Sequence, residues 1–393
     1  MSDIGPQGKS SSPSRIDPIT FQIVGRGLES VAREMGTTMM RTAYSSIFVE
    51  GLDFSCAVLD RWAEMAAQAN YNPVHLGAMA YAAEWSVMEI GYENLHPGDV
   101  LIHNDPYRGG THITDVTVVK PVFYEDRLVA MAANRAHQLD MGGMTPGGFA
   151  GNATEITQEG LILPPVKWYD RGKEVRDIFD IILSNVRLPN IQIGDFEAQL
   201  ASCLTAERRI LEMCRKYGTD VIIDILAELK DYSERRMRAE IQAMPDGVYE
   251  HEDFIDNDGI TDDPYRIKVA IKINGPDITF DYTGSSPQCL GPMNAVYGIT
   301  ASSTYNSLLS VSDPDIPVNH GCFRPVKIIA PRGTIVNSEK PGPTFGGNTD
   351  TSIRIMDACW GAFAQAIPER VTASTYGAIN SFTGGGYDDE RKK

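Results

Sequence analysis

The chain has 393 residues, 42% of them apolar, and a formal net charge of −17. Its length allows a sizeable buried core and two or three domains. The acidic balance argues against nucleic acid or an anionic membrane as a partner, because both are bound through clustered Lys and Arg that this sequence does not show. It has no apolar run long enough for a membrane span and no signal peptide, so we expect a cytoplasmic protein.

Several familiar motifs are absent or incomplete. The six cysteines show no C-x-x-C spacing, which predicts buried thiols rather than disulfides or a zinc ribbon. The stretch "DIGPQGKS" resembles a phosphate-binding loop, but Asp3 stands where the first Gly must be and no strand precedes it. There is no G-x-G-x-x-G after a strand, no G-x-S-x-G and no H-E-x-x-H. Nucleotide-binding, serine hydrolase and zincin functions are therefore not indicated.

The first half of the chain mixes helices with a hairpin. Residues 1–16 are rich in Ser, Pro and Gly and predict a mobile tail. Asp17-Pro18 is typical of a helix start, and apolar residues at spacings of three and four continue to about residue 42. We expect a strand over residues 52–59, a helix over 74–90 and a hairpin over 116–137. Together these elements form a first region, residues 17–193.

The second half changes its pattern near residue 246. Residues 194–245 have helical periodicity with a break at Gly218. From residue 247, "RIKVAIKI" and "DITFDYTG" alternate with period two around the turn sequence "NGPD", and one further helix is expected over residues 351–366. The fold class is therefore α+β, with a mixed helical and hairpin N-terminal region followed by a β-rich region over residues 246–393.

Two histidines and an aspartate converge on the predicted hairpin. With the turn centred near Glu125 and Asp126, Asp115 faces residue 136 and is adjacent to His137. His112 precedes Asp115 by three residues, a gap that lets both side chains reach one point. Two imidazoles and a carboxylate suit Zn²⁺, Mn²⁺ or Fe²⁺.

A structural explanation of the same residues stays open. Asp115 can cap a turn, and His137 can be a half-buried strand residue whose hydrogen bonds are satisfied by its neighbours. A metal site needs a further ligand from elsewhere in the chain, and Asp53 is the best candidate because it interrupts the strand-like stretch "LDFSCAVLD". It can equally be a cap at the start of that strand.

Four other residues are weaker candidates for the same site. His75, at a predicted helix start in "YNPVHLGAM", and Asp140, three residues after His137, are candidate catalytic groups that either support the ligands or accept a proton. His103 and Asp105 lie in "HNDP", which is itself a strong turn sequence and needs no metal to explain it.

Four motifs in order resemble the hydantoinase B/oxoprolinase family: "EGLDFSCAVLD", "NPVHLGAM", "GDVLIHNDPYRGGTHITDVTVV" and "NRAHQLDMGGMTPGG". The resemblance covers nearly the whole chain, from about residue 17 to residue 386. Metal-binding members of this family use an Asp from the early strand, then His-x-x-Asp and a later His, and the matching residues here are Asp53, His112, Asp115 and His137. Relative to the family, the chain looks short at its C-terminus.

The resemblance also implies a division of labour. A separate A-type ATPase subunit phosphorylates the substrate oxygen, and the B-type subunit completes the reaction with a divalent metal, within a hetero-oligomer. This implies the catalytic subunit of an ATP-dependent hydrolase of hydantoin-like or 5-oxoproline-like cyclic amides. The equivalent subunit of an acetone or acetophenone carboxylase and a non-catalytic scaffold subunit are the alternatives, and the motifs do not separate them.

Overall fold

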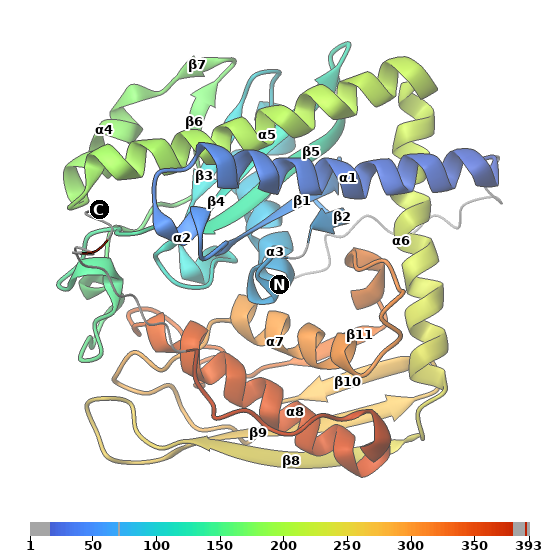
Figure 1. The fold of residues 1–393 in the computed structure, drawn as a ribbon. Helices are drawn as coiled ribbons and strands as arrows, with labels where there is room; N and C mark the ends of the chain where they lie inside the picture. Colours follow the sequence, from blue (N-terminus) through green and yellow to red (C-terminus); the bar gives the residue numbers. More distant parts are fainter. Residues whose placement is uncertain (1–15, 70, 380–389, 391–393) are drawn as a thin grey trace.

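The computed structural model describes residues 16–69, 71–379 and 390. Residues 1–15, which make up nearly all of the predicted tail, lie outside the described residues. The described part contains two β-sheets with helices packed on them, which confirms the α+β class (Figure 1).

The N-terminal sheet has seven strands in the order β2-β1-β5-β4-β3-β6-β7, and all neighbouring pairs are antiparallel. Its strands are β1 (Phe54–Asp60), β2 (Met65–Ala69), β3 (Val100–His103), β4 (Asp115–Tyr124), β5 (Arg127–His137), β6 (Val166–Asp170) and β7 (Lys173–Glu174). The central strands β1, β4 and β5 are almost entirely buried. Both faces of the sheet are therefore covered.

Helices lie on both faces of this sheet (Figure 1). One face packs against α1 (Pro18–Thr42) and α5 (Pro189–Tyr217), and the opposite face packs against α3 (Pro73–Ile90). Two shorter helices, α2 (Ser46–Val49) and α4 (Arg176–Asn185), complete this half. The alternation of side chains along β4 and β5 divides the core into two clusters, one on each face.

The long helix α6 (Thr219–Gln242) leads from this half to a second sheet (Figure 1). That sheet has the order β11-β10-β9-β8, with β8 (Gly247–Ile255), β9 (Tyr265–Asn274), β10 (Asp277–Asp281) and β11 (Val326–Ile329). Helix α8 (Ser352–Ala366) covers it by packing on β8 and β9, and α7 (Tyr297–Ser310) packs between α8 and α3. Sequence periodicity did not predict α7, because this Ser- and Thr-rich helix is buried on nearly all sides and has no polar face.

Most predicted boundaries agree closely with the structure. Helix α1 starts at Pro18, and the Asp17 carboxylate accepts a hydrogen bond from Thr20 N at 2.9 Å, as expected of an N-cap. The predicted break at Gly218 separates α5 from α6, and its φ of 92° explains why the helix stops there. Helix α5 begins at Pro189, earlier than the periodic pattern indicated. All six cysteines are free and buried, which confirms the expectation of thiols.

The β4–β5 hairpin has the predicted turn but a different register. Glu125 and Asp126 form the turn with φ values of 49° and 60°, which is typical of a type I′ hairpin. A bulge next to the turn, between Val122 and Phe123, shifts the pairing by one residue. Asp115 therefore lies directly opposite His137 and not opposite residue 136 as predicted, which brings the two side chains closer together.

Helices α3 and α7 pack closely against each other and so join the N-terminal and C-terminal halves. A Cβ added at Gly77 of α3 would lie 2.6 Å from the Ser302 Cα of α7. No side chain fits there without moving one of the helices, so glycine is required for this contact. Side chains from both sheets consequently share one apolar cluster.

The strained hairpin turn provides a test of the fold. Glu125 and Asp126 are exposed and adopt positive φ, a conformation that side chains with a Cβ disfavour by about 1 kcal/mol per residue. The double substitution Glu125→Asn and Asp126→Gly should raise the free energy of unfolding by roughly 1 kcal/mol. Urea denaturation measures the change. An equal or lower stability of the variant would contradict the type I′ geometry.

Candidate metal centre

Three candidate metal ligands meet at the open end of the β4–β5 hairpin. Asp115 is the first residue of β4 and pairs with His137, the last residue of β5. His112 lies three residues earlier, and its backbone carbonyl accepts a hydrogen bond from Asp115 N at 3.1 Å. One potential ligand atom from each of the three lies within 4.8 Å of the other two, and all three residues are buried. The structure thus brings together the three residues that were predicted to meet at the hairpin.

The Asp115 carboxylate is the centre of this group. His112 Nδ1 lies 3.1 Å from one carboxylate oxygen, and His137 Nδ1 lies 3.2 Å from the other. The Thr111 hydroxyl donates to the same carboxylate at 2.5 Å. The two imidazole rings lie 5.0 Å apart. Nitrogen and oxygen donors at this separation are what a small transition-metal ion requires.

Asp53 and His75 extend the group on the side of α3. Asp53 directly precedes β1, and its backbone carbonyl accepts from His137 N at 3.0 Å, which fixes it beside the hairpin end. His75, in the first turn of α3, places Nε2 3.2 Å from the Asp115 carboxylate and 3.6 Å from the Asp53 carboxylate. The Asn72 side-chain amide donates to Asp53 at 2.5 Å. Since 35% of the Asp53 side chain is exposed, it is the member of the group nearest to solvent.

Burial and mutual contact determine the protonation of the central residues. Burial alone would raise the pKa of Asp115, but the charges of His112 and His75 and its hydrogen bonds hold it well below the usual value. Burial lowers the pKa of His112 despite the neighbouring carboxylate. Burial also opposes protonation of His137, but its hydrogen bond and attraction to Asp115 outweigh this effect and raise the pKa. The site is thus a buried carboxylate between imidazoles in different electrostatic environments.

Two phenylalanines from distant segments form an aromatic wall beside the imidazoles. Phe345, in the segment between β11 and α8, lies 5.6 Å from the His112 ring. Phe149, in the loop after β5, lies 6.1 Å from the His137 ring and 4.1 Å from Phe345. Sequence reasoning missed both, because an isolated Phe in a Gly-rich loop carries no spacing signal. The two rings thus contact the imidazoles from this side of the site.

The buried Glu159 holds the segment that carries Phe345. Its carboxylate accepts from Thr344 N at 2.9 Å and from Phe345 N at 2.9 Å. Burial raises the pKa of Glu159 to about 7, although these backbone hydrogen bonds oppose the shift. No ion pair of the described residues involves this side chain. Glu159 therefore joins the C-terminal half to the candidate site. Its carboxyl is buried and has no cation to balance its charge within the described part of the chain.

Asp140, a candidate catalytic residue, makes contacts of a different kind. Its carboxylate accepts from the backbone N and the guanidinium of Arg187, both at 2.7 Å, and from Gly147 N at 3.2 Å. These bonds use both carboxylate oxygens and fix the loop that leads to Phe149. The contacts support a positioning role for Asp140 rather than proton transfer.

The surroundings of His103 and Asp105 indicate a role in the fold and not in the candidate metal site. Asp105 caps a turn by accepting from Tyr107 N at 3.0 Å, and it pairs with Arg108 and Lys340. His103 is fully buried at the end of β3, where burial and the charge of Arg135 lower its pKa to about 3. Its ring is therefore neutral. These contacts favour the turn interpretation of "HNDP".

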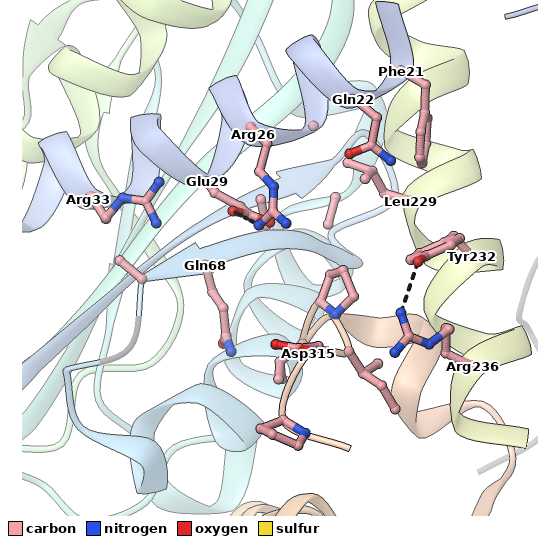
Figure 2. A pocket seen from close by; sticks show the side chains of 18 of the residues that line it. Phe21, Gln22, Arg26, Glu29, Arg33, Gln68, Leu229, Tyr232, Arg236 and Asp315 are labelled. Atoms are coloured by element: carbon pink, nitrogen blue, oxygen red, sulfur yellow. Dashed lines mark hydrogen bonds and ion pairs between the residues drawn. The ribbon is translucent and has the colours of Figure 1, made fainter. Parts of the chain in front are cut away.

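Two cavities of the described residues lie away from the His-Asp group. One of about 870 Å³ lies between α1, β2, α6 and residues 314–318, and Figure 2 shows its charged lining, which includes Arg26, Glu29, Arg236 and Asp315. A second, of about 530 Å³, lies between α3, the β1–β2 turn, α7 and residues 320–323. Neither is lined by the five residues of the candidate site. The chemistry of the donor atoms, and not the cavity volume, identifies the candidate site.

A second group of possible ligands, His96, Asp99 and Asp170, lies at the far edge of the first sheet. Lys167 places its ammonium group 2.9 Å from Asp99 and 3.0 Å from Asp170. This internal cation already balances the carboxylates. The group is therefore explained as a partly buried ion-pair network at the edge of the sheet.

Residues 17–393 match the sequence model of the hydantoinase B/oxoprolinase family, and the chain belongs to this family. It is 37% identical over 374 residues to the B component of a putative D-/L-hydantoinase from a Pseudomonas strain, covering 91% of this chain and 63% of that protein. The first three curated relatives are matched over only 63–66% of their own length. Within the described residues, no helix is long and apolar enough to span a membrane.

Two solved structures resemble the fold. The ATP-dependent caprolactamase of Pseudomonas jessenii superposes with a TM-score of 0.85 at 33% identity, covering 92% of this chain and 62% of that one. A nucleotide-free acetone carboxylase superposes with a TM-score of 0.85 over 91% of this chain and 50% of that one. At 18% identity, the second comparison shows a common fold only.

The raised pKa of Glu159 predicts a pH-dependent stability. The unfolded chain releases this proton near pH 4.5, whereas the folded chain keeps it up to about pH 7. Between these values the folded state binds more protons, so the carboxyl makes unfolding progressively easier as the pH rises. Compared with Glu159→Gln, the wild type should lose on the order of 1–3 kcal/mol of stability between about pH 5 and about pH 8.

Urea denaturation of both proteins at the two pH values measures this difference. Glu174→Gln, which changes an exposed glutamate of β7, is the matched control and should behave like the wild type. Parallel pH profiles for the wild type and Glu159→Gln would show that the Glu159 proton is not retained in the folded state.

Proposed function

We propose that this chain is the metal-containing catalytic subunit of an ATP-dependent hydrolase of cyclic amides. The observation that carries the proposal is the buried Asp115 carboxylate, held between His112 and His137 with a ligand atom of each residue within 4.8 Å of the others. Asp53 is proposed as the fourth ligand. The relatives named as a hydantoinase component and an ATP-dependent caprolactamase support the substrate class.

The residues present fit a single divalent transition metal such as Zn²⁺, Mn²⁺ or Fe²⁺. The donor set combines two imidazoles with two carboxylates, of which Asp53 is partly open to solvent. His75 Nδ1 is a buried polar atom without a hydrogen-bond partner among the described residues, which is unusual unless the region holds a further group. A divalent cation held there supplies Lewis acidity and lowers the pKa of water towards neutrality.

The protein groups around the ligands have separate proposed roles. His75, between Asp53 and Asp115, orients both carboxylates and is the proposed group for moving a proton between the site and solvent. The lowered pKa of His112 favours its neutral form, which leaves a nitrogen lone pair for coordination. Phe149 and Phe345 exclude water from one side. Asp140 positions the loop that carries Phe149.

The proposed division of labour requires a partner. An A-type ATPase subunit would phosphorylate the amide oxygen of the substrate, and this chain would then act on the more electrophilic ring carbon. The name of one relative as the B component of a hydantoinase, and the ATP dependence in the name of the caprolactamase, support this arrangement as a hetero-oligomer. The alternative reaction, carboxylation of a ketone, is supported by a likeness of fold alone. A scaffold role would leave the buried ligand set without a chemical purpose.

Removing a ligand should remove the metal without unfolding the chain. In His112→Ala and His137→Ala, one coordinate bond is lost and the bound metal should fall by at least about tenfold, with loss of turnover in the assembled enzyme. The fold should persist, because two extensive apolar clusters stabilise it independently of the ion. Elemental analysis and thermal melts of the purified chains measure both quantities.

The matched control is His251→Ala, an exposed histidine of β8 that should retain the metal. His103→Ala should also keep the metal, because "HNDP" is explained as a turn. Wild-type protein without stoichiometric metal after metal-supplemented expression would refute the site, as would a His137→Ala chain that keeps both metal and activity.

A substrate panel distinguishes the three functions. The chain should be co-purified with its A-type subunit and assayed for ATP turnover with hydantoin, 5-oxoproline and caprolactam, and with acetone or acetophenone plus bicarbonate. We expect cyclic-amide-dependent ATP hydrolysis and ring opening, which require both subunits. Ketone-dependent turnover would establish the carboxylase function instead, and full activity of the His112→Ala complex would establish a scaffold.

A further inference from the structure

The α3 cavity, of about 530 Å³ between α3, the β1–β2 turn, α7 and residues 320–323, is lined by aromatic rings and acidic groups. Trp62 and Tyr92 meet edge to face with ring centroids 5.8 Å apart. On another wall, Tyr305 stacks on Phe323 at 3.9 Å, and the Tyr305 hydroxyl lies 2.8 Å from that of Tyr81. The faces of aromatic rings carry partial negative charge and attract cations.

Glu84 differs from the other charged residues of this cavity because its carboxylate is unpaired within the described part of the chain. No ion pair or hydrogen bond of the described residues involves its carboxylate, and the charged group that influences it is another acid, Glu64. Glu84 remains accessible at the mouth of the cavity, but partial desolvation still raises its pKa. A cation beside it would gain attraction without displacing an existing partner.

The other charges around the cavity are already compensated. Glu64 contacts Lys230, and it lies 3.5 Å from the His320 imidazole and 3.7 Å from the Arg324 guanidinium. Lys230 also contacts Asp60, and Arg324 pairs with other acids on α6. Burial lowers the pKa of His320, which favours its neutral form. Glu84 is therefore the group that leaves a negative charge for a ligand.

The larger cavity shows a contrasting pattern. There Arg26 pairs with Glu29 at 2.9 Å, and Arg236 pairs with Asp313 and donates to the Tyr232 hydroxyl (Figure 2). Arg26, Glu29 and Arg236 thus have charged partners within the protein. Arg33 and Asp315 also line this cavity and form no ion pair among the described residues, so charges of both signs are open there, whereas the α3 cavity leaves only the acid Glu84 open.

We propose that the α3 cavity binds a small organic cation of the alkylammonium class, with the aromatic rings around its apolar groups and Glu84 as its counter-charge. The volume lies within the range of small-molecule sites. Trp62, Met88 and Tyr92 are 45%, 55% and 38% exposed at its rim, which keeps the entrance accessible and apolar. Arg61 lies 5.1 Å from the Trp62 ring, so this one ring already contacts a cation of the protein.

This site is separate from the candidate metal centre. The lining residues Gly77, Tyr81, Glu84 and Met88 recur at spacings of three and four and share one face of α3. His75 faces the other way, towards the sheet. The cavity therefore does not depend on the proposed metal chemistry, and its ligand can be tested on the purified chain.

Calorimetric titration of the full chain with choline and n-butylammonium tests the proposal, and 3,3-dimethyl-1-butanol serves as the uncharged isostere of choline. At least one cation should bind, and the isostere should bind roughly tenfold more weakly if a charge is recognised. Glu84→Gln should weaken the cation by a similar factor. Glu93→Gln, an exposed neighbour that does not line the cavity, is the matched control.

Two further measurements test whether the cation binds in this cavity and whether the variants leave the proposed metal site unchanged. Trp62→Phe should abolish any fluorescence change caused by the cation, and the metal content of all variants should equal that of the wild type. The proposal is wrong if neither cation binds, if the isostere binds as tightly as choline, or if Glu84→Gln binds the cations like the wild type. None of these results bears on the His112 and His137 substitutions, so the two proposals fail independently.

Discussion

The pairing of Asp115 with His137 is the constraint on which the candidate site depends. In an antiparallel ladder, directly opposed residues place their side chains on the same face, and here that face is the one covered by α3. The pairing brings a carboxylate and an imidazole together at a strand end, where His112 can join them. A shift of register by one residue would turn either side chain to the opposite face.

The rest of the N-terminal half secures this arrangement. Strand β1 pairs along β5, so that Asp53 arrives beside His137 through a backbone hydrogen bond. Helix α3 then directs His75 between the two carboxylates. Because α1 and α5 cover the opposite face of the same sheet, the strands are buried and the candidate ligands on them have little freedom to move. Asp115, His137 and His75 thus belong to strands and a helix, and Asp53 and His112 lie in the short segments directly before β1 and β4.

The sequence was sufficient for features encoded by neighbouring residues. The N-cap Asp17, the helix break at Gly218 and the hairpin turn at Glu125 each have a local signature, and each was found at the expected place. The exact register was not predictable, because the bulge at Val122 has no sequence signal of its own. Helix α7 was missed for a related reason, since a helix buried on all sides lacks amphipathic periodicity.

The candidate site likewise combines features that the sequence predicted with features that it did not. Three of the proposed ligands occur within 26 residues of one another, and hairpin geometry alone suggested that they meet. Glu159 and Phe345 take part through contacts between segments 186 or more residues apart, which a single sequence does not encode in any short pattern. Asp140 was close to the ligands in sequence, but its carboxylate is directed to Arg187.

The late position of Phe345 in the chain has a consequence for biosynthesis. All the proposed ligands are synthesised by residue 137, and the first sheet is complete by β7, whereas the wall residue Phe345 leaves the ribosome far later. Since domains tend to fold as the chain emerges, the ligand group can assemble while one side is still open to solvent. The order of translation thus leaves an interval in which an ion can enter before the C-terminal half closes over it.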